Sequence, residues 1–475
     1  MIFSQPIFFV FLAALLCVYS LCRTQTERAV TLLVGSLIFY ASWKPAYLIL
    51  LVLSVSLNYL FYSGLARTRS KRLLVTALVI NLALLGSIKY LGMLIDSVIS
   101  VAALAGHADT GLDSSWTHWA LPLGISFYTF HMLSVMIDVY RGEWNTRISF
   151  RAWWLYISFF PHMVAGPILR ASELVEQLER LGPLQARDLK LGALIFMGGL
   201  IKKVLFADNF AGLADELWAN PEQLDTATAW LAVTAFALQI YFDFSGYSEM
   251  AIGLARGFGV TLPRNFLYPY ISRNPQEFWQ RWHITLSRWL RDYLYVSLGG
   301  SRSGQARTII NLMITMVLGG LWHGAAWNFV IWGFLHGSWL AAHRVAKPWL
   351  PKPQSSPARA AYVFASWAVS LTVVWVTWVF FRATSTDSAL LICARMFGLA
   401  DGSDAPPAVR SYVWALTAAT SVLVLLEPWL VNKAEALQDD WSRTSPLLRG
   451  TTYAFIIVSI VVLGGSVQRF IYFDF

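Results

Sequence analysis

Charged residues are scarce in this sequence. Only 13% of its 475 residues are Asp, Glu, Lys or Arg, whereas a soluble domain carries about 25%. Hydrophobic residues make up 57%, a share that excludes an ordinary soluble enzyme and a disordered chain. The composition instead predicts an all-α polytopic membrane protein that contacts the lipid bilayer.

Cysteine is rarer still. Cys17, Cys22 and Cys393 stand singly, so they predict neither a disulfide framework nor a metal cluster. The sequence also lacks the glycine-rich phosphate loops and the serine elbow of dinucleotide-binding proteins, nucleoside triphosphatases and serine hydrolases. The net charge of +9 is typical of cytoplasmic loops that follow the positive-inside rule. Without a separate basic domain, this charge does not predict nucleic acid as a partner.

Apolar segments of roughly 20 residues predict membrane crossings. We expect twelve, near residues 2–21, 29–43, 46–65, 73–95, 119–139, 190–206, 227–256, 308–321, 326–344, 361–381, 411–430 and 450–468. A further segment, 152–169, contains Pro161, Gly166 and Pro167, which favour a re-entrant hairpin buried in protein. Together these segments predict one integral membrane domain over 1–475, which ends in a terminal helix with an aromatic tail at 450–475.

The charges between the crossings predict their orientation. Basic loops are expected inside, at 67–72, 264–307 and 345–360. The acidic loop 208–226 is expected outside. Alternation then places both termini outside, which is the periplasm for a bacterial inner membrane. Lys202 and Lys203 are exceptions at the outer end of a crossing, where we expect them to face a water-filled cavity.

The segment 264–307 is the richest in candidate residues. Asn274-Pro275 predicts the start of a helix, which carries one apolar stripe: Trp279, Trp282, Leu286, Trp289 and Tyr293. Arg281 and Arg288 lie off this stripe, and Arg288 is spaced to pair with Asp292. Two interpretations stand. The helix lies in the cytoplasmic membrane interface, or the segment forms a vestibule whose arginines attract the phosphates of a donor.

His323 lies among glycines in GGLWHG, at 319–324. The small neighbours leave room for a substrate, and histidine is the natural general base near neutral pH. The alternative is a packing histidine that bonds a neighbouring carbonyl. His336 is expected to pack or to support the active-site residues, but its role stays open, as do the roles of His131 and His162.

Two acids, Asp243 and Glu249, fall inside the apolar segment 227–256. A carboxylate within the membrane needs a partner, and the lysines and arginines of the chain are the candidates. The same polar residues are compatible with a permeation path. An exporter or transporter without acyl chemistry is therefore the alternative function from a different class.

Two stretches resemble the membrane-bound O-acyltransferase superfamily: FWQRWHITLSRWLRDYLYVSLGGSR at 278–302 and GGLWHGAAWNFVIWG at 319–333. The chain is more closely similar to the bacterial branch that includes the membrane subunit of alginate O-acetyltransferase, through LPLGISFYTF, IDVYRG, FPHMVAGPILR, GLIKKVLFAD and YFDFSGYSEMAIGLA. This resemblance covers the whole chain. It implies a ring of helices, some of them amphipathic, around a central tunnel. It also implies that His323 is the catalytic residue and His283 the second polar residue of the active site.

The resemblance implies an acetyltransferase of the bacterial inner membrane. Such an enzyme takes an acetyl group from a cytoplasmic thioester, acetyl-CoA or a carrier-bound acetyl group, for an extracytoplasmic polysaccharide such as alginate. No bound cofactor is expected, and Arg281, Arg288 and Trp282 are expected at the donor. The implied partners are a periplasmic serine-type acetyltransferase and a polysaccharide biosynthesis complex. Cellulose and peptidoglycan are alternative acceptors, and His131, which departs from the alginate members, leaves the polymer open.

The last residues carry one more resemblance. Phe470, Tyr472 and Phe475 are similar to an F-x-Y-x-x-F tail of this branch, which implies that Tyr472 accepts the acetyl group and passes it to the partner enzyme. The alternative is a belt of aromatic side chains that anchors the last helix at the membrane interface.

Overall fold

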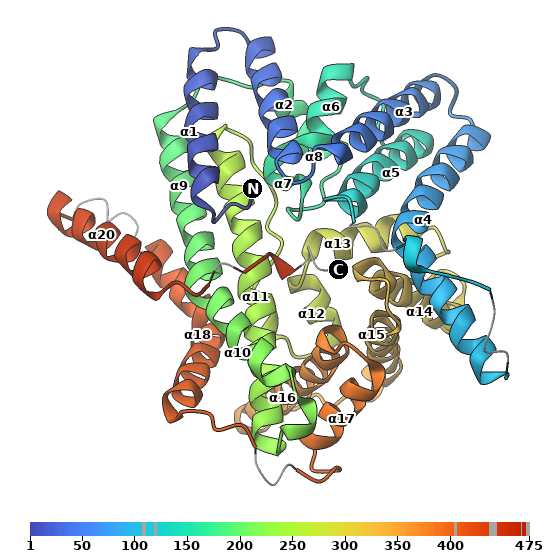
Figure 1. Ribbon diagram of the computed structural model, residues 1–475, viewed down its shortest axis with the longest axis vertical. Coiled ribbons are helices and arrows are strands. Elements are labelled where there is room, and N and C mark those ends of the chain that lie inside the picture. Colours follow the sequence, from blue (N-terminus) through green and yellow to red (C-terminus); the bar gives the residue numbers. More distant parts are fainter. Residues whose placement is uncertain (107–110, 118–120, 403–405, 437–443, 467, 472–475) are drawn as a thin grey trace.

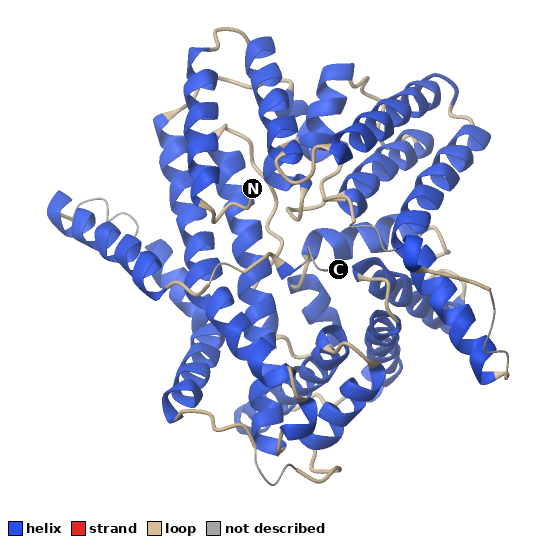
Figure 2. Cartoon of the chain, in the orientation of Figure 1, coloured by secondary structure: helices blue, strands red, loops and turns tan. Residues whose placement is uncertain are grey.

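The computed structural model describes residues 1–475 except 107–110, 118–120, 403–405, 437–443, 467 and 472–475. Throughout the described residues the regular elements are helices (Figure 2), which confirms the all-α prediction. Tyr472 and Phe475 lie outside the described residues, so what the sequence predicts for them stays a prediction.

The elements follow one another around a central helix, α11 (Figure 1). The N-terminal part forms α1 (Pro6–Leu21), α2 (Gln25–Ala41), α3 (Ala46–Thr68), α4 (Lys71–Leu104), α5 (Ile125–Arg141), α6 (Phe150–Ser158), α7 (Phe160–Met163) and α8 (Ala171–Leu178). The middle part forms α9 (Ala186–Ile201), the π-helix η2 (Lys202–Ala207), α10 (Asp208–Trp218), α11 (Thr226–Gly257), α12 (Pro275–Arg281), α13 (Ile284–Trp289) and the π-helix η5 (Leu290–Tyr295). The C-terminal part forms α14 (Gly304–His323), α15 (Trp327–Ala346), α16 (Ser356–Arg382), α17 (Thr386–Met396), α18 (Ser411–Ala436) and α20 (Pro446–Leu463).

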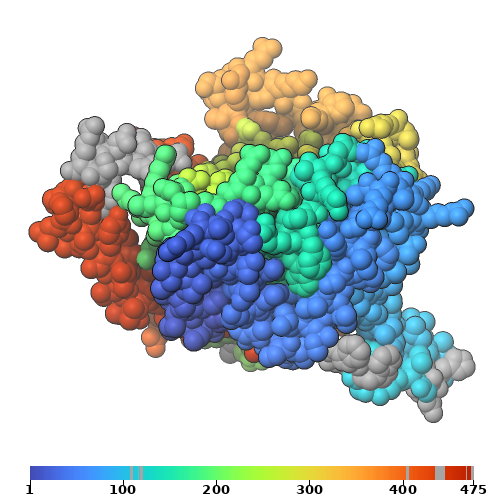
Figure 3. Space-filling model, turned by 90° about the horizontal axis from the view of Figure 1, so that it is seen from above, coloured from blue at the N-terminus to red at the C-terminus, as the bar shows by residue number. Residues whose placement is uncertain are grey.

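Six of the described helices are long and apolar enough to cross a membrane: Ala46–Thr68, Lys71–Leu104, Thr226–Gly257, Ser356–Arg382, Ser411–Lys433 and Pro446–Leu463. They make the chain a polytopic membrane protein, while the number of twelve crossings stays a prediction. α20 and the end of α4 project from opposite sides of the body (Figure 3). Their apolar side chains point outward, with Leu104 89% and Val461 77% exposed, as expected for surfaces that lipid covers.

Glycines hold α9 against α11. A Cβ atom on Gly199 would lie 2.5 Å from the carbonyl oxygen of Gly246, and a Cβ atom on Gly253 would lie 2.5 Å from that of Gly192. Only glycine permits two helices to approach this closely, which is a common way of packing helices in membranes. Because the contacts pair 192 with 253 and 199 with 246, the two helices run antiparallel (Figure 1).

A second close pair, α14 and α15, positions His323. A Cβ atom on Gly320 would lie 2.2 Å from the carbonyl oxygen of Phe329, and a Cβ atom on Gly333 would lie 2.3 Å from that of Met316. The two glycines therefore fix the spacing of the pair. His323 ends α14, one turn beyond Gly320, so this packing also sets the place of its ring.

The segment 152–169 is interrupted, as predicted. α6 ends at Ser158 and α7 begins at Phe160, and every residue of the segment is buried. Backbone that is not continuous helix is tolerated within a membrane protein where other protein covers it. The depth of this segment in the membrane stays a prediction.

The prediction of one continuous helix from Asn274 to Tyr293 is wrong. α12 ends at Arg281 and α13 starts at Ile284, because residues 265–267 take over hydrogen bonds that a continuous helix would make. The Ile284 N–H donates to the Asn265 carbonyl oxygen (2.9 Å), and the Leu267 N–H donates to that of Arg281 (2.9 Å). The predicted stripe is thus divided between two helices.

The prediction of a loop at 208–226 is also wrong over most of its length. Residues 208–218 form α10, which buries Phe210, Ala214 and Leu217. These positions recur at helical spacing. Of the acidic residues that favoured an outer loop, Asp215 and Glu216 lie on the exposed side of α10, whereas Asp208 is buried.

Candidate active site

His323 lies in a buried aromatic cluster and is 3% exposed. The centroid of its ring is 5.0 Å from that of Trp322, 5.0 Å from that of Trp332 and 5.1 Å from that of Phe381. These rings come from α14, α15 and α16 and meet the imidazole edge to face. A side chain held on several sides keeps one orientation, as a general base requires.

His283 reaches the same cluster from the junction of α12 and α13. It is fully buried, and its backbone is left-handed, with φ at 42°, a conformation that is uncommon for residues other than glycine. Its ring lies 4.6 Å from that of Phe244 and 6.0 Å from that of Trp322. Since Trp322 also neighbours His323, the fold brings together the two histidines that the sequence singled out.

Lys89 of α4 supports the end of α14. Its ammonium donates to the carbonyl oxygens of Trp322 (2.5 Å) and His323 (3.2 Å), and the Tyr90 hydroxyl donates to that of Leu321 (2.9 Å). The last carbonyls of a helix have no partner within it and carry partial negative charge. Our sequence reasoning missed Lys89, although a lysine inside the apolar segment 73–95 was the available signal.

Two cavities adjoin His323 and share Lys89. The smaller measures about 50 Å³ and is lined by both residues and by 121–127. The larger, about 900 Å³, begins at Gly324 and is lined by hydroxyl-bearing and charged residues of α4 and of the start of α17, among them Asp96 and Thr386. The sequence between Lys89 and Arg141 contains no Lys or Arg, so the charge pattern predicts that the loop after α4, beside this cavity, lies outside. We call this cavity the outer groove.

A third cavity, the basic groove, lies on the side of 264–307. It measures about 610 Å³. Its cationic residues lie on two walls. One wall carries Arg288 and Arg291, and the other carries Arg344, near the end of α15, and Lys347, which follows α15. The sequence indicated the first wall only. A basic groove of this kind suits a phosphorylated ligand.

Arg281 and Trp282 do not line this groove. The Arg281 guanidinium donates to the carbonyl oxygen of Leu267 (3.2 Å). Trp282 is 1% exposed and packs between Phe278 and Trp378, with ring centroids 5.8 Å and 4.8 Å away. Both residues hold the walls of the site together here, and their contact with a donor stays a prediction.

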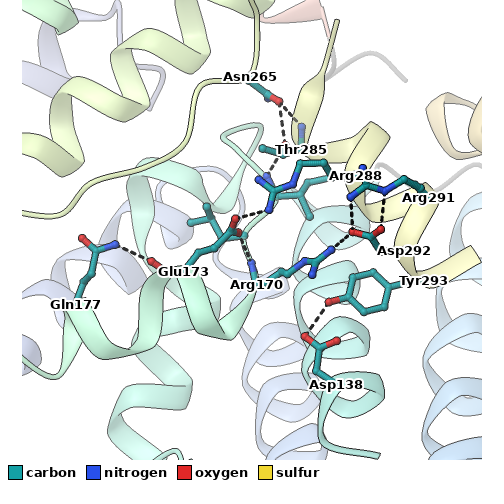
Figure 4. A network of polar contacts seen from close by, with 12 residues as sticks. Asp138, Arg170, Glu173, Gln177, Asn265, Thr285, Arg288, Arg291, Asp292 and Tyr293 are labelled. Carbon is teal, nitrogen blue, oxygen red and sulfur yellow. Dashed lines mark hydrogen bonds and ion pairs between the residues drawn. The ribbon is translucent and has the colours of Figure 1, made fainter. Parts of the chain in front are cut away.

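A network of ion pairs fixes 284–295 against α8 and α5 (Figure 4). Arg288 pairs with Glu173 (2.7 Å), whereas Asp292 pairs with Arg170 and with Arg291. The predicted pair of Arg288 with Asp292 is therefore wrong. η5 begins at Leu290 as a π-helix, so the spacing of an α-helix does not hold between these residues.

The intramembrane acids have lysine partners. Lys203 lies 2.7 Å from Asp208 and 2.8 Å from Asp243, and the three side chains are at most 3% exposed. Lys202 lies 2.6 Å from Glu249 and 2.8 Å from Glu427. The expectation that both lysines face a water-filled cavity is wrong for Lys203, because α9 and α11 pack so closely that its ammonium is enclosed.

The chain returns to this lysine cluster at its end. Gly465 crosses η2, with its N–H donating to the carbonyl oxygen of Val204 (3.4 Å), and the Ile471 N–H donates to the Asp243 carboxylate (2.7 Å). Phe470 is fully buried, and its ring lies 5.7 Å from that of Phe244, the neighbour of His283. The tail thus runs into the interior (Figure 1), and Phe470 does not anchor the chain at a membrane interface.

Three further histidines are buried. His336 packs as predicted, with its ring 4.6 Å from that of Trp332 and 5.1 Å from that of Trp279. The rings of His131 and His162 lie 4.8 Å apart, and His162 Nε2 is 3.0 Å from the Tyr156 carbonyl oxygen.

Comparisons with known proteins match most of the chain. The family model of MBOAT, the membrane-bound O-acyltransferase family, matches residues 116–386, which include His283 and His323. The chain is 40% identical over 407 residues to the probable alginate O-acetylase AlgI of Azotobacter vinelandii, covering 84% of this chain and 79% of that protein. It is 38% identical over 505 residues to the probable alginate O-acetylase AlgI of Pseudomonas putida, covering 100% of both. It is 35% identical over 434 residues to the peptidoglycan O-acetyltransferase of Helicobacter pylori, covering 84% of this chain and 80% of that protein.

Proposed function

The chain belongs to the membrane-bound O-acyltransferase family, and we propose that it moves acetyl groups from a cytoplasmic thioester across the bacterial inner membrane for an extracytoplasmic polysaccharide. The observation that carries this proposal is the position of His323. It stands at the end of α14, its ring and that of His283 both neighbour Trp322, and it lines the smaller of the two cavities. The orientation of the chain, with both termini in the periplasm, is part of the proposal.

His323 is proposed to act as the general base. It takes the proton of an acceptor hydroxyl as the oxygen attacks the thioester carbonyl carbon. The carbon–sulfur bond breaks, and the departing thiolate is protonated to a thiol. The cavity of about 50 Å³ beside His323 has room for a few water-sized groups, which is enough for an acetyl group.

The basic groove is proposed to hold the donor. Acetyl-CoA and carrier-bound acetyl groups both present phosphates, which arginine recognises well. Arg288, Arg291, Arg344 and Lys347 line the groove. Since Arg288 is already paired with Glu173 and Arg291 with Asp292, we expect Arg344 and Lys347 to contribute more to donor binding than either.

Tyr472 is proposed to accept the acetyl group first. Ile471, the residue before it, is held at Asp243, and Phe470 lies one aromatic ring from His283. The phenol oxygen of Tyr472 would form an ester with the acetyl group. A periplasmic serine-type acetyltransferase then takes the acetyl group and returns the proton to the phenol. The phenolate of Tyr472 is a good leaving group when this ester bond breaks in the second transfer.

Substitutions of His323 and Tyr472 test the proposal. In a deletion strain that expresses each variant at wild-type level, His323→Gln should lower polymer acetyl content at least ~100-fold, because a general base contributes about 10²–10⁴ in rate. Tyr472→Phe removes only the hydroxyl and should abolish acetylation, whereas Tyr412→Phe, at an exposed tyrosine of α18, should not. Normal acetylation by Tyr472→Phe would restrict the tail to an anchoring role. Normal acetylation by His323→Gln would overturn the assignment of His323 as the general base.

The acceptor is proposed to be alginate. The names of two relatives support this polymer, and the name of a third supports peptidoglycan. Cellulose is a further candidate. Mass analysis of the secreted polymer and of the peptidoglycan from a deletion strain distinguishes them, since only the true acceptor loses its acetyl groups.

A further inference from the structure

A separate cavity lies away from the site described above, between the end of α3 and the segment 142–147 that follows α5. It measures about 470 Å³. Among the described residues that line it, Arg67, Arg69 and Arg147 are cationic and none is acidic. Tyr59 and Tyr62 form its aromatic wall. A concave site with three positive charges and no carboxylate repels metal ions and attracts anions.

Arg69 is held in place within this cavity. Its backbone is left-handed, with φ at 46°, which is uncommon for a residue other than glycine and persists where the surroundings fix it. Its guanidinium donates to the side-chain oxygen of Asn145 and lies across Gly142, where a Cβ atom would be only 3.4 Å from the guanidinium nitrogen Nη1. The contact leaves other N–H groups of the guanidinium available, since a guanidinium carries five donors.

The aromatic wall is equally fixed. The Tyr62 hydroxyl accepts the N–H of Ile148 (2.6 Å) and donates to the carbonyl oxygen of Thr146 (3.4 Å). Its ring stacks on that of Trp153, with centroids 5.2 Å apart. The cavity is therefore preformed, which lowers the entropic cost of binding.

The position of the cavity favours a ligand from the cytoplasmic side. Arg67 and Arg69 belong to the basic loop 67–72, which the charge pattern predicts to be inside, and Arg147 lines the same cavity. The positive-inside rule alone accounts for basic residues in such a loop. It does not account for the hydrogen bond that holds the Arg69 guanidinium at Asn145, or for an arginine from a different loop, Arg147, in the same cavity.

We propose that this cavity binds a phosphate-bearing anion through Arg67, Arg69 and Arg147. Arginine forks match phosphate oxygens in pairs. Two sources supply this chemistry: the head group of an anionic phospholipid in the cytoplasmic leaflet, and a soluble phosphate compound. The proposal does not depend on the acetyl-transfer reaction.

Thermal unfolding of the purified full-length protein in a zwitterionic detergent tests this proposal. The probes are phosphatidylglycerol, phosphatidylcholine and inorganic pyrophosphate. The test variant is Arg67→Gln/Arg147→Gln. The matched control is Arg302→Gln/Arg359→Gln, which removes the same charge from exposed positions elsewhere on the predicted cytoplasmic side. Both variants leave Arg69 in place, because its backbone conformation is part of the fold.

Phosphatidylglycerol is expected to stabilise the wild type and the control more than phosphatidylcholine does. The test variant should bind it about tenfold more weakly or worse, because charge-assisted contacts are lost, and salt should weaken the wild-type effect. A shift with pyrophosphate but not with phosphatidylglycerol would support the cavity with a soluble ligand. No shift with either probe, or equal shifts in the test and control variants, would overturn the proposal. Mass spectrometry of co-purified lipid gives an independent readout.

Discussion

Replacing Lys203 with methionine should destabilise the protein strongly. Lys203 lies 2.7 Å from Asp208 and 2.8 Å from Asp243, and the exposed fractions of the three side chains are 3%, 2% and 3%. Removing one partner of a buried ion pair costs about 3–5 kcal/mol, because the remaining charge is left without compensation. Lys203→Met leaves two such carboxylates, so we expect a loss of unfolding free energy at the upper end of this range.

Two matched variants separate charge from packing. In Lys203→Met/Asp208→Asn/Asp243→Asn the cluster is neutral, and part of the lost stability should return. Lys202→Met removes the neighbouring lysine, whose partners Glu249 and Glu427 are 35% and 15% exposed. Water screens that pair better, so its removal should be less costly.

The assay is reversible unfolding in mixed detergent micelles, followed by tryptophan fluorescence. A loss below about 1 kcal/mol in Lys203→Met, the range of exposed pairs, would refute our account of the cluster.

One further variant tests how the end of the chain is held near Ile471. Asp243→Leu removes the acceptor of the Ile471 N–H, so a C-terminal tag should become more accessible to protease than in the wild type.

Three further predictions concern the site and its supports. Lys89→Met removes the donors to the Trp322 and His323 carbonyls and should lower the rate of acetylation about tenfold or more. Lys89→Arg keeps a cationic donor and should retain much of the rate. Equal rates in both variants would show that Lys89 has no part in the site. Gly320→Ala places a Cβ atom 2.2 Å from a carbonyl oxygen and should destabilise the protein by roughly 1–3 kcal/mol in thermal unfolding, while Gly86→Ala, with no atom within 4 Å, should be neutral or stabilising. Asp292→Asn weakens the pairs with Arg170 and Arg291 and should raise KM for the donor more than it lowers kcat, since this network holds the wall of the basic groove.

Local patterns in the sequence predicted the helical class, which the structure confirms, and singled out His323, whose role stays a prediction, because apolar runs and a glycine-flanked histidine are contiguous features. Contacts between distant segments were not predictable in the same way. The break at His283 depends on Asn265, which lies 18 residues earlier and supplies the hydrogen-bond acceptors that divide the helix. In the sequence Lys89 is a single polar residue in an apolar run, and only the fold shows that it contacts the end of α14. Similarly, partners for Asp243 were required on physical grounds, but the sequence did not identify Lys203 among the many cations.

The buried cluster of Lys203, Asp208 and Asp243 is linked to the end of the chain by a hydrogen bond from Ile471. A lysine between two aspartates leaves one formal negative charge, and a lone buried charge is unfavourable in a medium that holds little water. The Ile471 N–H donates to the Asp243 carboxylate, and such a charge-assisted bond stabilises the ionised form. Ile471 therefore adds a hydrogen-bond donor to a cluster whose side chains come from η2, α10 and α11. Asp243 is adjacent in sequence to Phe244, whose ring lies 4.6 Å from that of His283. The hydrogen bond between Ile471 and Asp243 therefore also holds Ile471 close to the histidine pair.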